Sequence, residues 1–316
     1  MPTSTACFYS LWLLLLLVFP IGLRAQQAPL TGVVVDAASG QPVPFAVVEI
    51  RARQVGVQAT EQGTFRLDLP GTLTATDSLR VSSLGFVPQL LAVPHALPCR
   101  LVLRPLAVAL PEAVVRASRA PLVRLGPTEN GNNFSYGVGA KLGAENSTGW
   151  QVARYFAAPP AGTIQAVRYY VMPASQCGKI SAQTPFRVRL YAADGPQGTP
   201  GTDLITTSLV TAASKKGWHE VDLSKLQLPV PVTGFFVAME WLYTKAEFGC
   251  ETQYLTPAKE RKTGYSYGQS LGGYLNKEPQ AAWHRSAGHA WQQFKADRFL
   301  NKGNSNAAIQ AIIQPD

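Results

Sequence analysis

Short apolar runs, separated by turn residues, fill residues 31–88. The segment 36–44 contains Asp, Ser, Gly and two prolines, which is the composition of a turn, and an apolar run at 45–50 follows it. In the segment 64–69, TFRLDL, apolar residues alternate with polar ones, which is the period of a half-buried strand. No helix of three turns fits between these breaks, so the pattern predicts a small all-β sandwich.

The same kind of pattern continues after residue 134. Residues 186–191 (FRVRLY) alternate, residues 218–223 (WHEVDL) read as another strand, and residues 235–242 (FFVAMEWL) are the most hydrophobic strand of the region. Strands that recur with loop-rich spacing and no helical period indicate a second antiparallel sandwich, jelly-roll-like in its organisation. The predicted fold class is therefore all-β, with two tandem antiparallel β-sandwiches.

The turn and core residues of the first region fall in a specific order. They are Gly32, Val34, Asp36, Gly40, Pro42, Val43, Pro44, Ala46, Val48, Gly63, Phe65, Asp77, Leu79, Val81, Ser82, Gly85 and Phe86. This order resembles the carboxypeptidase-like regulatory domain. The resemblance implies a non-catalytic, transthyretin-like β-sandwich of bacterial secreted and outer-membrane proteins, found at the N-terminus of TonB-dependent receptors or beside other extracellular domains. More weakly, the second region resembles an uncharacterised domain found downstream of such modules, and this second resemblance implies no activity.

The first residues have the pattern of a targeting segment. Nine apolar residues at 11–19 end at Pro20, and Leu23-Arg24-Ala25 precedes Gln26, which is typical of a secretory leader cut after Ala25. An uncleaved anchor is the alternative, although nine residues are fewer than the roughly 20 that span a bilayer. We expect an exported protein, periplasmic, outer-membrane-associated or extracellular, without a transmembrane span once the leader is removed.

The domain organisation follows from these patterns. We predict a signal peptide at 1–25, the regulatory-like sandwich at 28–104, a short strand and linker at 105–133, and the second sandwich at 134–316. In the resembling family a short strand follows the module, and residues 112–115 are expected to supply it.

Charge gives little indication of a partner. The net charge is +9, yet only 15% of the residues are charged, and the densest basic run, at 259–262, is short and interrupted by an acidic residue. A nucleic-acid-binding surface is usually a basic patch or stripe, so no nucleic-acid partner is expected. The run itself is typical of a solvated loop.

Three cysteines, Cys99, Cys177 and Cys250, remain after the predicted leader. Cys177 and Cys250 lie in Gly-containing polar segments of the second region, and export would permit a disulfide between them. Three free thiols are the alternative, because spacing does not determine pairing. No Cys-His cluster with metal-ligand spacing is present, so neither a metal nor another cofactor is expected.

Catalytic motifs are weak. None of the four histidines begins an HxxE or HExxH pattern, and His219 and Glu220 are adjacent, so on a strand they point to opposite faces. Residues 264–268 match GxSxG, but no buried strand precedes them and no helix follows, which favours a Gly/Tyr-rich loop. We therefore do not expect an enzyme. A hydrolase would use Ser266 with His284 or His289 as base, or Glu240 with Asp222.

Glu240 lies in the apolar strand 235–242, on the face that it shares with Phe236, Ala238 and Leu242. A carboxylate in such a place must be paired or must line a wet cleft. One interpretation is a buried ion pair with one of the region's arginines, for example Arg187 or Arg189. The other is a polar contact to a ligand in a groove of the sandwich.

The second region is rich in aromatic residues: Trp150, Trp218, Trp241, Tyr243, Trp283 and Trp291. Aromatic side chains on a sandwich stack on sugar rings, but tryptophans are more often packed in a core. Trp283 and Trp291 lie in a polar stretch with Gly and His and are the expected exposed pair. The candidate ligand-binding residues are therefore Glu240, Tyr243, Trp283 and Trp291.

Together these observations predict a non-catalytic, secreted accessory or adhesion protein of the cell envelope, which binds a glycan or another surface component through its second domain. Two alternatives remain open. One is the secreted hydrolase described above. The other is a structural partner of an outer-membrane complex that docks by strand addition at a sheet edge.

Overall fold

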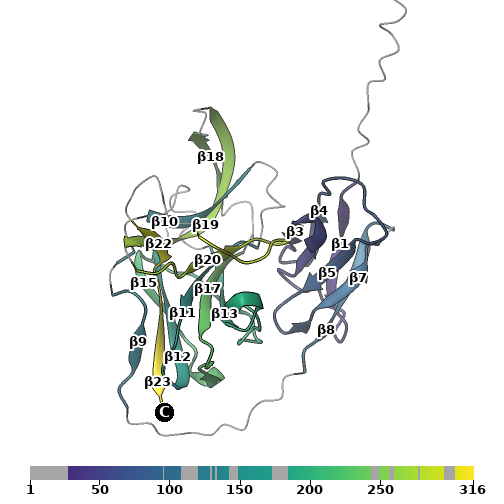
Figure 1. The fold of residues 1–316 in the computed structure, drawn as a ribbon. Helices are drawn as coiled ribbons and strands as arrows, with labels where there is room; N and C mark the ends of the chain where they lie inside the picture. Colours follow the sequence, from purple (N-terminus) through teal and green to yellow (C-terminus); the bar gives the residue numbers. More distant parts are fainter. Residues whose placement is uncertain are drawn as a thin grey trace, which may run out of the picture.

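In the computed structural model, almost all of the regular secondary structure of the described residues is β-strand, arranged in two adjacent units (Figure 1). It describes residues 28–94, 96–107, 120–128, 130–131, 134–141, 149–172, 184–242, 249–255, 260–276, 278–294 and 303–316. In these ranges the helical structure includes the short 3₁₀ turns η2 (Arg51–Arg53), η5 (Pro196–Gly198) and η6 (Ser224–Leu226). No helix in these ranges has the length and apolar character needed to cross a bilayer.

The first unit is a sandwich of two four-stranded sheets, with strand orders β4-β1-β8-β6 and β3-β2-β5-β7. Its strands are β1 (Leu30–Asp36), β2 (Val47–Ile50), β3 (Val55–Gln58), β4 (Thr64–Leu67), β5 (Ser78–Ser82), β6 (Phe86–Val87), β7 (Gln89–Ala92) and β8 (Cys99–Pro105). Every second residue of these strands enters the core, where Val34, Val48, Leu67 and Leu79 are completely buried. We call this unit the first sandwich.

One strand pair departs from the antiparallel pairing that we predict. β1 and β8 run parallel, with Gly32 opposite Cys99. Parallel neighbours need a crossover connection, and here the six intervening strands provide it. A Cβ atom at Gly32 would lie 2.2 Å from the carbonyl oxygen of Cys99, so only glycine permits this close approach of the two backbones.

The second unit is a larger sandwich of a nine-stranded and a six-stranded sheet. Its strands are β9 (Val123–Leu125), β10 (Phe134–Lys141), β11 (Gln151–Phe156), β12 (Gly162–Met172), β13 (Phe186–Ala192), β14 (Leu209–Thr211), β15 (Gly217–Asp222), β16 (Leu228–Pro229), β17 (Phe235–Trp241), β18 (Gly249–Leu255), β19 (Arg261–Asn276), β20 (Ala282–Arg285), β21 (Gln292–Gln293), β22 (Asn304–Ala307) and β23 (Ile309–Pro315). We call this unit the second sandwich.

The chain crosses repeatedly between these two sheets. The nine-stranded sheet has the path β10-β19-β12-β23-β9 with four strands beside it, and the six-stranded sheet has the order β14-β13-β17-β11-β20-β21. Thus β11, β12 and β13, although consecutive, alternate between the sheets, as the strands of a jelly roll do. The predicted all-β fold of two tandem sandwiches is confirmed.

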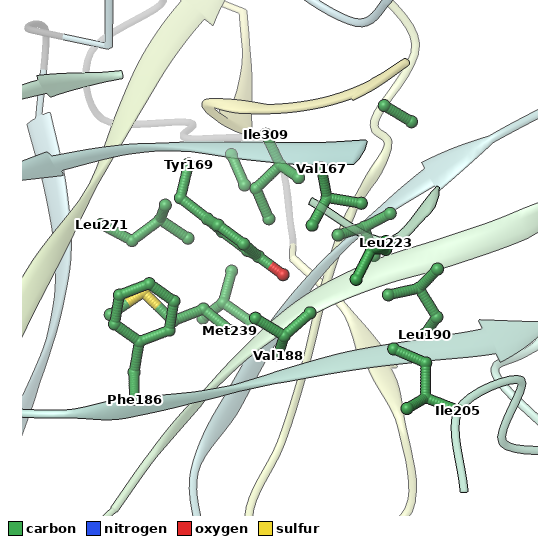
Figure 2. Close-up of a cluster of buried hydrophobic side chains, with 14 of the residues drawn as sticks. Val167, Tyr169, Phe186, Val188, Leu190, Ile205, Leu223, Met239, Leu271 and Ile309 are labelled. Atoms are coloured by element: carbon green, nitrogen blue, oxygen red, sulfur yellow. The ribbon is translucent and has the colours of Figure 1, made fainter. Parts of the chain in front are cut away.

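The core of the second sandwich lies between its two sheets. Figure 2 shows Tyr169 of β12 reaching from one sheet into the cluster formed with Phe186, Val188 and Met239 from the other. The Tyr169 side chain is completely buried, and its hydroxyl donates a hydrogen bond of 3.1 Å to the backbone oxygen of Ala238. This bond satisfies the one polar atom that the tyrosine brings into the core.

The boundary between the units differs from the one that we predict. β9 lies inside the predicted linker 105–133, yet it pairs with β23 and is an edge strand of the second sandwich. Gln310 of β23 also donates a hydrogen bond from Nε2 to the backbone oxygen of Pro127. Strand pairing with a distant part of the chain is not visible in the local sequence pattern. The predicted leader at 1–25 and the predicted strand at 112–115 lie outside the described residues.

Candidate functional site at the seam of the two sandwiches

Two sheet faces that point away from their own cores meet at one seam. In the first sandwich the sheet β3-β2-β5-β7 supplies this face, and in the second the six-stranded sheet supplies it. The residues that alternate outward along these strands include Gly56, Gln58, Glu49 and Arg80 on one side and Gln151, Arg187, Arg189, Glu240 and Arg285 on the other. Figure 1 shows β3 on the side of the first sandwich that is turned toward the second. The seam is therefore rich in charged and amide side chains.

Glu49 of β2 is one centre of this seam, and its side chain is completely buried. Its Oε1 accepts hydrogen bonds of 2.8 Å from Arg51 Nε and from Arg80 Nη1. Its Oε2 accepts a hydrogen bond of 3.1 Å from Arg285 Nη2 and one of 2.9 Å from the backbone N–H of Gly288. Since Arg285 and Gly288 belong to the second sandwich, this carboxylate joins the two units.

Glu240 of β17 is the second centre and is also completely buried. Its Oε1 accepts a hydrogen bond of 2.9 Å from Gln58 Nε2 of the first sandwich. Its Oε2 accepts one of 3.0 Å from Arg189 Nη1 and lies 3.5 Å from Arg187 Nη1. The guanidinium of Arg187 in turn lies over the ring of Phe45, 5.6 Å from its centroid. Of the two sequence-based interpretations of Glu240, the structure has the buried ion pair.

The electrostatics of both carboxylates follow from this arrangement. Burial by itself raises the pKa of Glu49 and of Glu240, because it disfavours the charged form. The facing arginines outweigh burial: Arg285 and Arg51 act on Glu49, and Arg187 and Arg189 act on Glu240. The pKa of each carboxyl is consequently held below its usual value. Both groups are ionised at neutral pH and hold the arginines in place.

Close backbone contact accompanies these charges. A Cβ atom at Gly56 of β3 would lie 2.6 Å from the carbonyl carbon of Ala287 and 2.6 Å from the backbone nitrogen of Gly288. Gly288 itself has a φ of +84°, in the left-handed region that glycine adopts without strain. The segment after β20 can therefore lie directly against β3 only because both positions are glycine.

A cleft of about 920 Å³ opens beside the two buried carboxylates, between the sandwiches. Five arginines line it: Arg51, Arg80, Arg187, Arg189 and Arg285. Asp203 also lines it and accepts a hydrogen bond of 2.7 Å from Arg189 Nη2. Trp291 and Tyr191 contribute aromatic rings, which meet edge to face with their centroids 5.5 Å apart. Positively charged and aromatic side chains thus face the same open space.

The four candidate ligand-binding residues have different positions. Trp291 is half-buried and lines the cleft, and Trp283 is half-buried on the same sheet face, edge to face with Phe236. Both are therefore partly covered by neighbouring side chains instead of fully exposed. Glu240 is enclosed by Gln58 and the arginines and does not itself line the cleft, whereas Arg187 and Arg189, which it holds, do. Tyr243 lies outside the described residues.

The other tryptophans have structural contacts. Trp241 is buried, stacks at a 35° tilt on Trp150 and donates a hydrogen bond of 2.8 Å from Nε1 to the backbone oxygen of Gln269. Trp218 of β15 lies edge to face against Tyr170, on the nine-stranded sheet. Trp241 and Trp150 pack in the core between the two sheets, and Trp218 packs beside Tyr170 on the nine-stranded sheet, so none of the three lines the cleft.

The structure gives the bonding state of two of the three cysteines that follow the predicted leader. Cys250 of β18 is disulfide-bonded, whereas Cys99 of β8 is a free, buried thiol whose pKa is raised by burial. Cys177, the partner that we predict for Cys250, lies outside the described residues, so this pairing stays a prediction. In the part of the chain that the structure describes, no three His, Cys, Asp or Glu side chains form a group that could hold a metal ion.

The residues of the hydrolase alternative are not brought into a catalytic arrangement. Ser266, which we predict to lie in a loop, lies inside β19, with Gly139 of β10 on one side and Cys250 of β18 on the other. A serine of the GxSxG type needs a sharp turn between a strand and a helix, and this position has none. The prediction of a loop is wrong because residues 261–276 form a long strand that pairs with β10, β12, β18 and β22.

The histidines and acids of that alternative are occupied elsewhere. The ring of His284 packs on Phe294 with centroids 4.4 Å apart, and His289 Nδ1 lies 3.3 Å from Ser286 Oγ. Asp222 ends β15 in the nine-stranded sheet, where it accepts a hydrogen bond of 2.8 Å from the backbone N–H of Ser224. Glu240 belongs to the other sheet, so the structure does not bring these two carboxylates together.

Sequence reasoning missed Glu49 and Arg285. The signal for Glu49 is present, because the strand Val47-Val48-Glu49-Ile50 places a carboxylate among apolar residues as the strand around Glu240 does. The same argument from burial predicts a partner for it. Arg285 has no such signal, since its role depends on where β20 lies relative to β2.

Comparison with known proteins gives a family match for the first unit. Residues 29–96 match the model of the carboxypeptidase regulatory-like domain family. No curated protein matches the sequence. Among solved structures, the cysteine protease and lectin-like domains of Cwp84, a surface layer associated protein of Clostridium difficile, are 13% identical with a TM-score of 0.34, over 53% of this chain and 32% of that one.

A second structure, clostridial Cwp84 cysteine protease after propeptide cleavage, is 12% identical with a TM-score of 0.37, over 83% of this chain and 52% of that one. The chain thus covers about a third and about half of these two structures, and at such scores the likeness transfers no activity. What the family match and the strand topology establish is the nature of the first unit. Residues 29–96 form a carboxypeptidase regulatory-like domain, which is docked through a charged seam on a second β-sandwich.

Proposed function

We propose that the protein is an exported, non-catalytic binding protein of the cell envelope that holds a glycan in the cleft between its two sandwiches. The observation that carries this proposal is the position of Trp291, edge to face with Tyr191, at the wall of a cleft of about 920 Å³. Ligand sites are typically concave, of roughly 300–1,000 Å³, with aromatic walls and a few polar groups that orient the ligand. Sugar rings pack on such aromatic faces.

Export is supported by three separate features. The first is the leader pattern before Gln26. The second is the regulatory-like domain, because the family that it resembles occurs in secreted and envelope proteins. The third is the disulfide at Cys250, because disulfides persist mainly in oxidising compartments outside the cytosol.

A binding role is favoured over hydrolysis by the state of the acidic and nucleophilic groups. Glu240 has both carboxylate oxygens engaged by Gln58 and the arginines, and Ser266 lies inside a paired strand. A general acid or base must reach the bond that is broken, and a nucleophile must be exposed to it. Neither residue meets this requirement.

The experiment uses the mature protein, from Gln26 onward, on a panel of insoluble polysaccharides and envelope preparations, and scores bound protein and released soluble sugar together. We expect retention without release of sugar. Trp291→Ala is expected to weaken retention about tenfold, the equivalent of about 1.4 kcal/mol. Trp218→Ala is the matched control, because Trp218 is also half-buried but lies on the other sheet, and it is expected to bind like the wild type.

Two outcomes contradict the proposal. Release of sugar that Ser266→Ala abolishes would make the protein a hydrolase. Absence of binding to any polysaccharide, with a defined envelope protein retained instead, would favour the structural partner that docks by strand addition.

A further inference from the structure

The wall of the cleft carries more positive charge than the buried carboxylates balance. Arg51 and Arg80 of the first sandwich and Arg285 of the second all converge on Glu49. Three guanidinium groups thus share one carboxylate, which leaves a surplus of two positive charges. Burial, together with the neighbouring charge of Arg51, lowers the pKa of Arg80 below its usual value.

The other side of the cleft does not remove this surplus. Arg189 and Arg187 face Glu240 and Asp203, so two positive charges meet two negative ones. Arg187 is 2% exposed, and its Nε has no hydrogen-bond partner within the described residues. A buried donor without a partner is costly, and an acceptor in the cleft would satisfy it.

The arginines around Glu49 also keep unused donors. Within the described part of the chain, Arg51 donates only from Nε and Arg80 only from Nη1. The remaining N–H groups of a guanidinium form a planar fork that matches the two oxygens of a carboxylate. Both side chains line the cleft, and that of Arg51 is 53% exposed.

We infer that the cleft binds an acidic polysaccharide, whose carboxylate groups are held by Arg51, Arg80 and Arg285 and whose sugar rings pack on Trp291. This inference rests on the proposed function and adds the chemical class of its ligand. A polysaccharide is favoured over an acidic protein because the arginines and the aromatic pair Trp291 and Tyr191 face one space. A carboxylated sugar presents an anionic group and a flat apolar ring face within one unit.

The inference also gives the seam a role in binding. Arg51 and Arg80 come from the regulatory-like domain and Arg285 from the second sandwich, so neither unit alone holds the complete set. Glu49 fixes all three arginines at one point of the seam. The ligand would therefore bind only to the docked pair of sandwiches.

The test measures affinity for two matched probes, polygalacturonate and the same polymer with its carboxyl groups methyl-esterified. We expect the mature protein to bind polygalacturonate at least about tenfold more tightly than the ester, with an affinity that falls as salt is raised. Arg51→Gln is expected to weaken polygalacturonate binding about tenfold and to leave binding of the ester unchanged.

The matched control is Arg66→Gln. Arg66 belongs to the same sandwich, has the same 53% exposure as Arg51 and pairs with Asp68 away from the cleft. The Arg66→Gln variant therefore removes the same charge and is expected to bind polygalacturonate like the wild type. Because Arg80 and Arg285 still hold Glu49 when Arg51 is replaced, the variant is expected to unfold at the wild-type urea concentration. The urea measurement thus distinguishes weaker binding caused by the loss of a ligand contact from weaker binding caused by unfolding of the variant.

Each remaining outcome has one meaning. Equal binding of both polymers, lost in Trp291→Ala but not in Arg51→Gln, overturns the inference and leaves the proposed function in place. Binding of neither polymer, or of any other polysaccharide, overturns both. Binding of polyglutamate as tight as that of polygalacturonate overturns the inference in favour of an acidic protein as ligand.

Discussion

Gln58 of the first sandwich donates a hydrogen bond of 2.9 Å from Nε2 to Oε1 of Glu240 in the second, across 182 positions of sequence. Both side chains are buried, at 4% and 0% exposure. A hydrogen bond to a charged group is stronger than one between neutral groups, and here it connects the regulatory-like domain to the arginines of the second sandwich. We therefore expect the two sandwiches to unfold together, and the following variants test this coupling.

Replacing Glu240 by Gln should be strongly destabilising. The variant keeps the shape of the side chain but leaves Arg187, which is 2% exposed, without its counter-charge. Removing one partner of a buried ion pair typically costs about 3–5 kcal/mol, because the other charge stays buried. We expect a loss of about 3 kcal/mol or more in the free energy of unfolding, measured by urea denaturation.

Glu220→Gln is the matched control for that variant. Glu220 pairs with Arg168 at 3.3 Å, but its side chain is 55% exposed. An exposed ion pair contributes at most about 1 kcal/mol, so this variant should unfold close to the wild type. Equal losses in the two variants would contradict the assignment of Glu240 to a buried network.

Acid should weaken the protein through Glu49. The pKa of its carboxyl is lowered from the usual 4.5, because Arg285, Arg51 and Arg80 outweigh the effect of burial. The unfolded chain therefore binds more protons than the folded one as the pH falls below 4.5. The stabilisation is fully present above that pH and is lost progressively below it.

The measurement is the free energy of unfolding as a function of pH, between about pH 3 and pH 7. Wild type should lose stability below its plateau, and Glu49→Gln should have a smaller slope in the acidic range and a lower plateau. Because Glu240 titrates in the same direction, the slope is expected to decrease and not to vanish. A slope identical to that of wild type would contradict the role given to Glu49.

Gly56→Ala should separate the two sandwiches without disturbing either core. The new Cβ would lie 2.6 Å from the backbone of Ala287 and Gly288, which cannot move as a flexible side chain can. Overpacking of this kind costs about 1–3 kcal/mol. We expect two unfolding transitions in calorimetry and a larger radius of gyration in solution scattering.

Gly137→Ala on β10 is the control for a glycine-to-alanine change in a strand. Its Cβ would meet only the hydroxyl of Ser270, at 3.3 Å, away from the seam. This variant should keep a single transition and the wild-type radius of gyration. If Gly56→Ala behaved in the same way, the close contact between β3 and the segment after β20 would not hold the units together.

Thiol titration tests the cysteine assignments on the mature protein. Cys99 is buried with a raised pKa, and the thiolate is the reactive form, so the native protein should react slowly with a thiol reagent. Denaturation without reductant should expose one thiol, and denaturation with reductant should expose all three cysteines that follow the leader. Peptide mapping that links Cys250 to a residue other than Cys177 would contradict the predicted pairing.

The alternation along single strands is the part of the fold that could be predicted most directly. Phe235, Val237 and Met239 enter the core, and Phe236 and Glu240 lie on the opposite face, as the pattern of FFVAMEWL indicates. A buried carboxylate needs a nearby positive charge, so an arginine partner for Glu240, for example Arg187 or Arg189, could also be predicted, and the structure has both. We predict that Trp283 and Trp291 are exposed, but the structure has both half-buried, because a neighbouring aromatic ring covers each of them in part.

By itself, the sequence determined the β-rich nature of both units, the order of turns that identifies residues 29–96 and the outward face on which Glu240 lies. These properties depend on neighbours in the chain, because side chains alternate with period two along any strand. Only the tertiary structure decided the parallel pairing of β1 with β8, the meeting of Glu49 with Arg285 across 236 positions and the arginine-lined cleft beside them. Each of these joins residues from distant strands, and which sheet faces pack against each other is set by the burial of both units together, which no local pattern records.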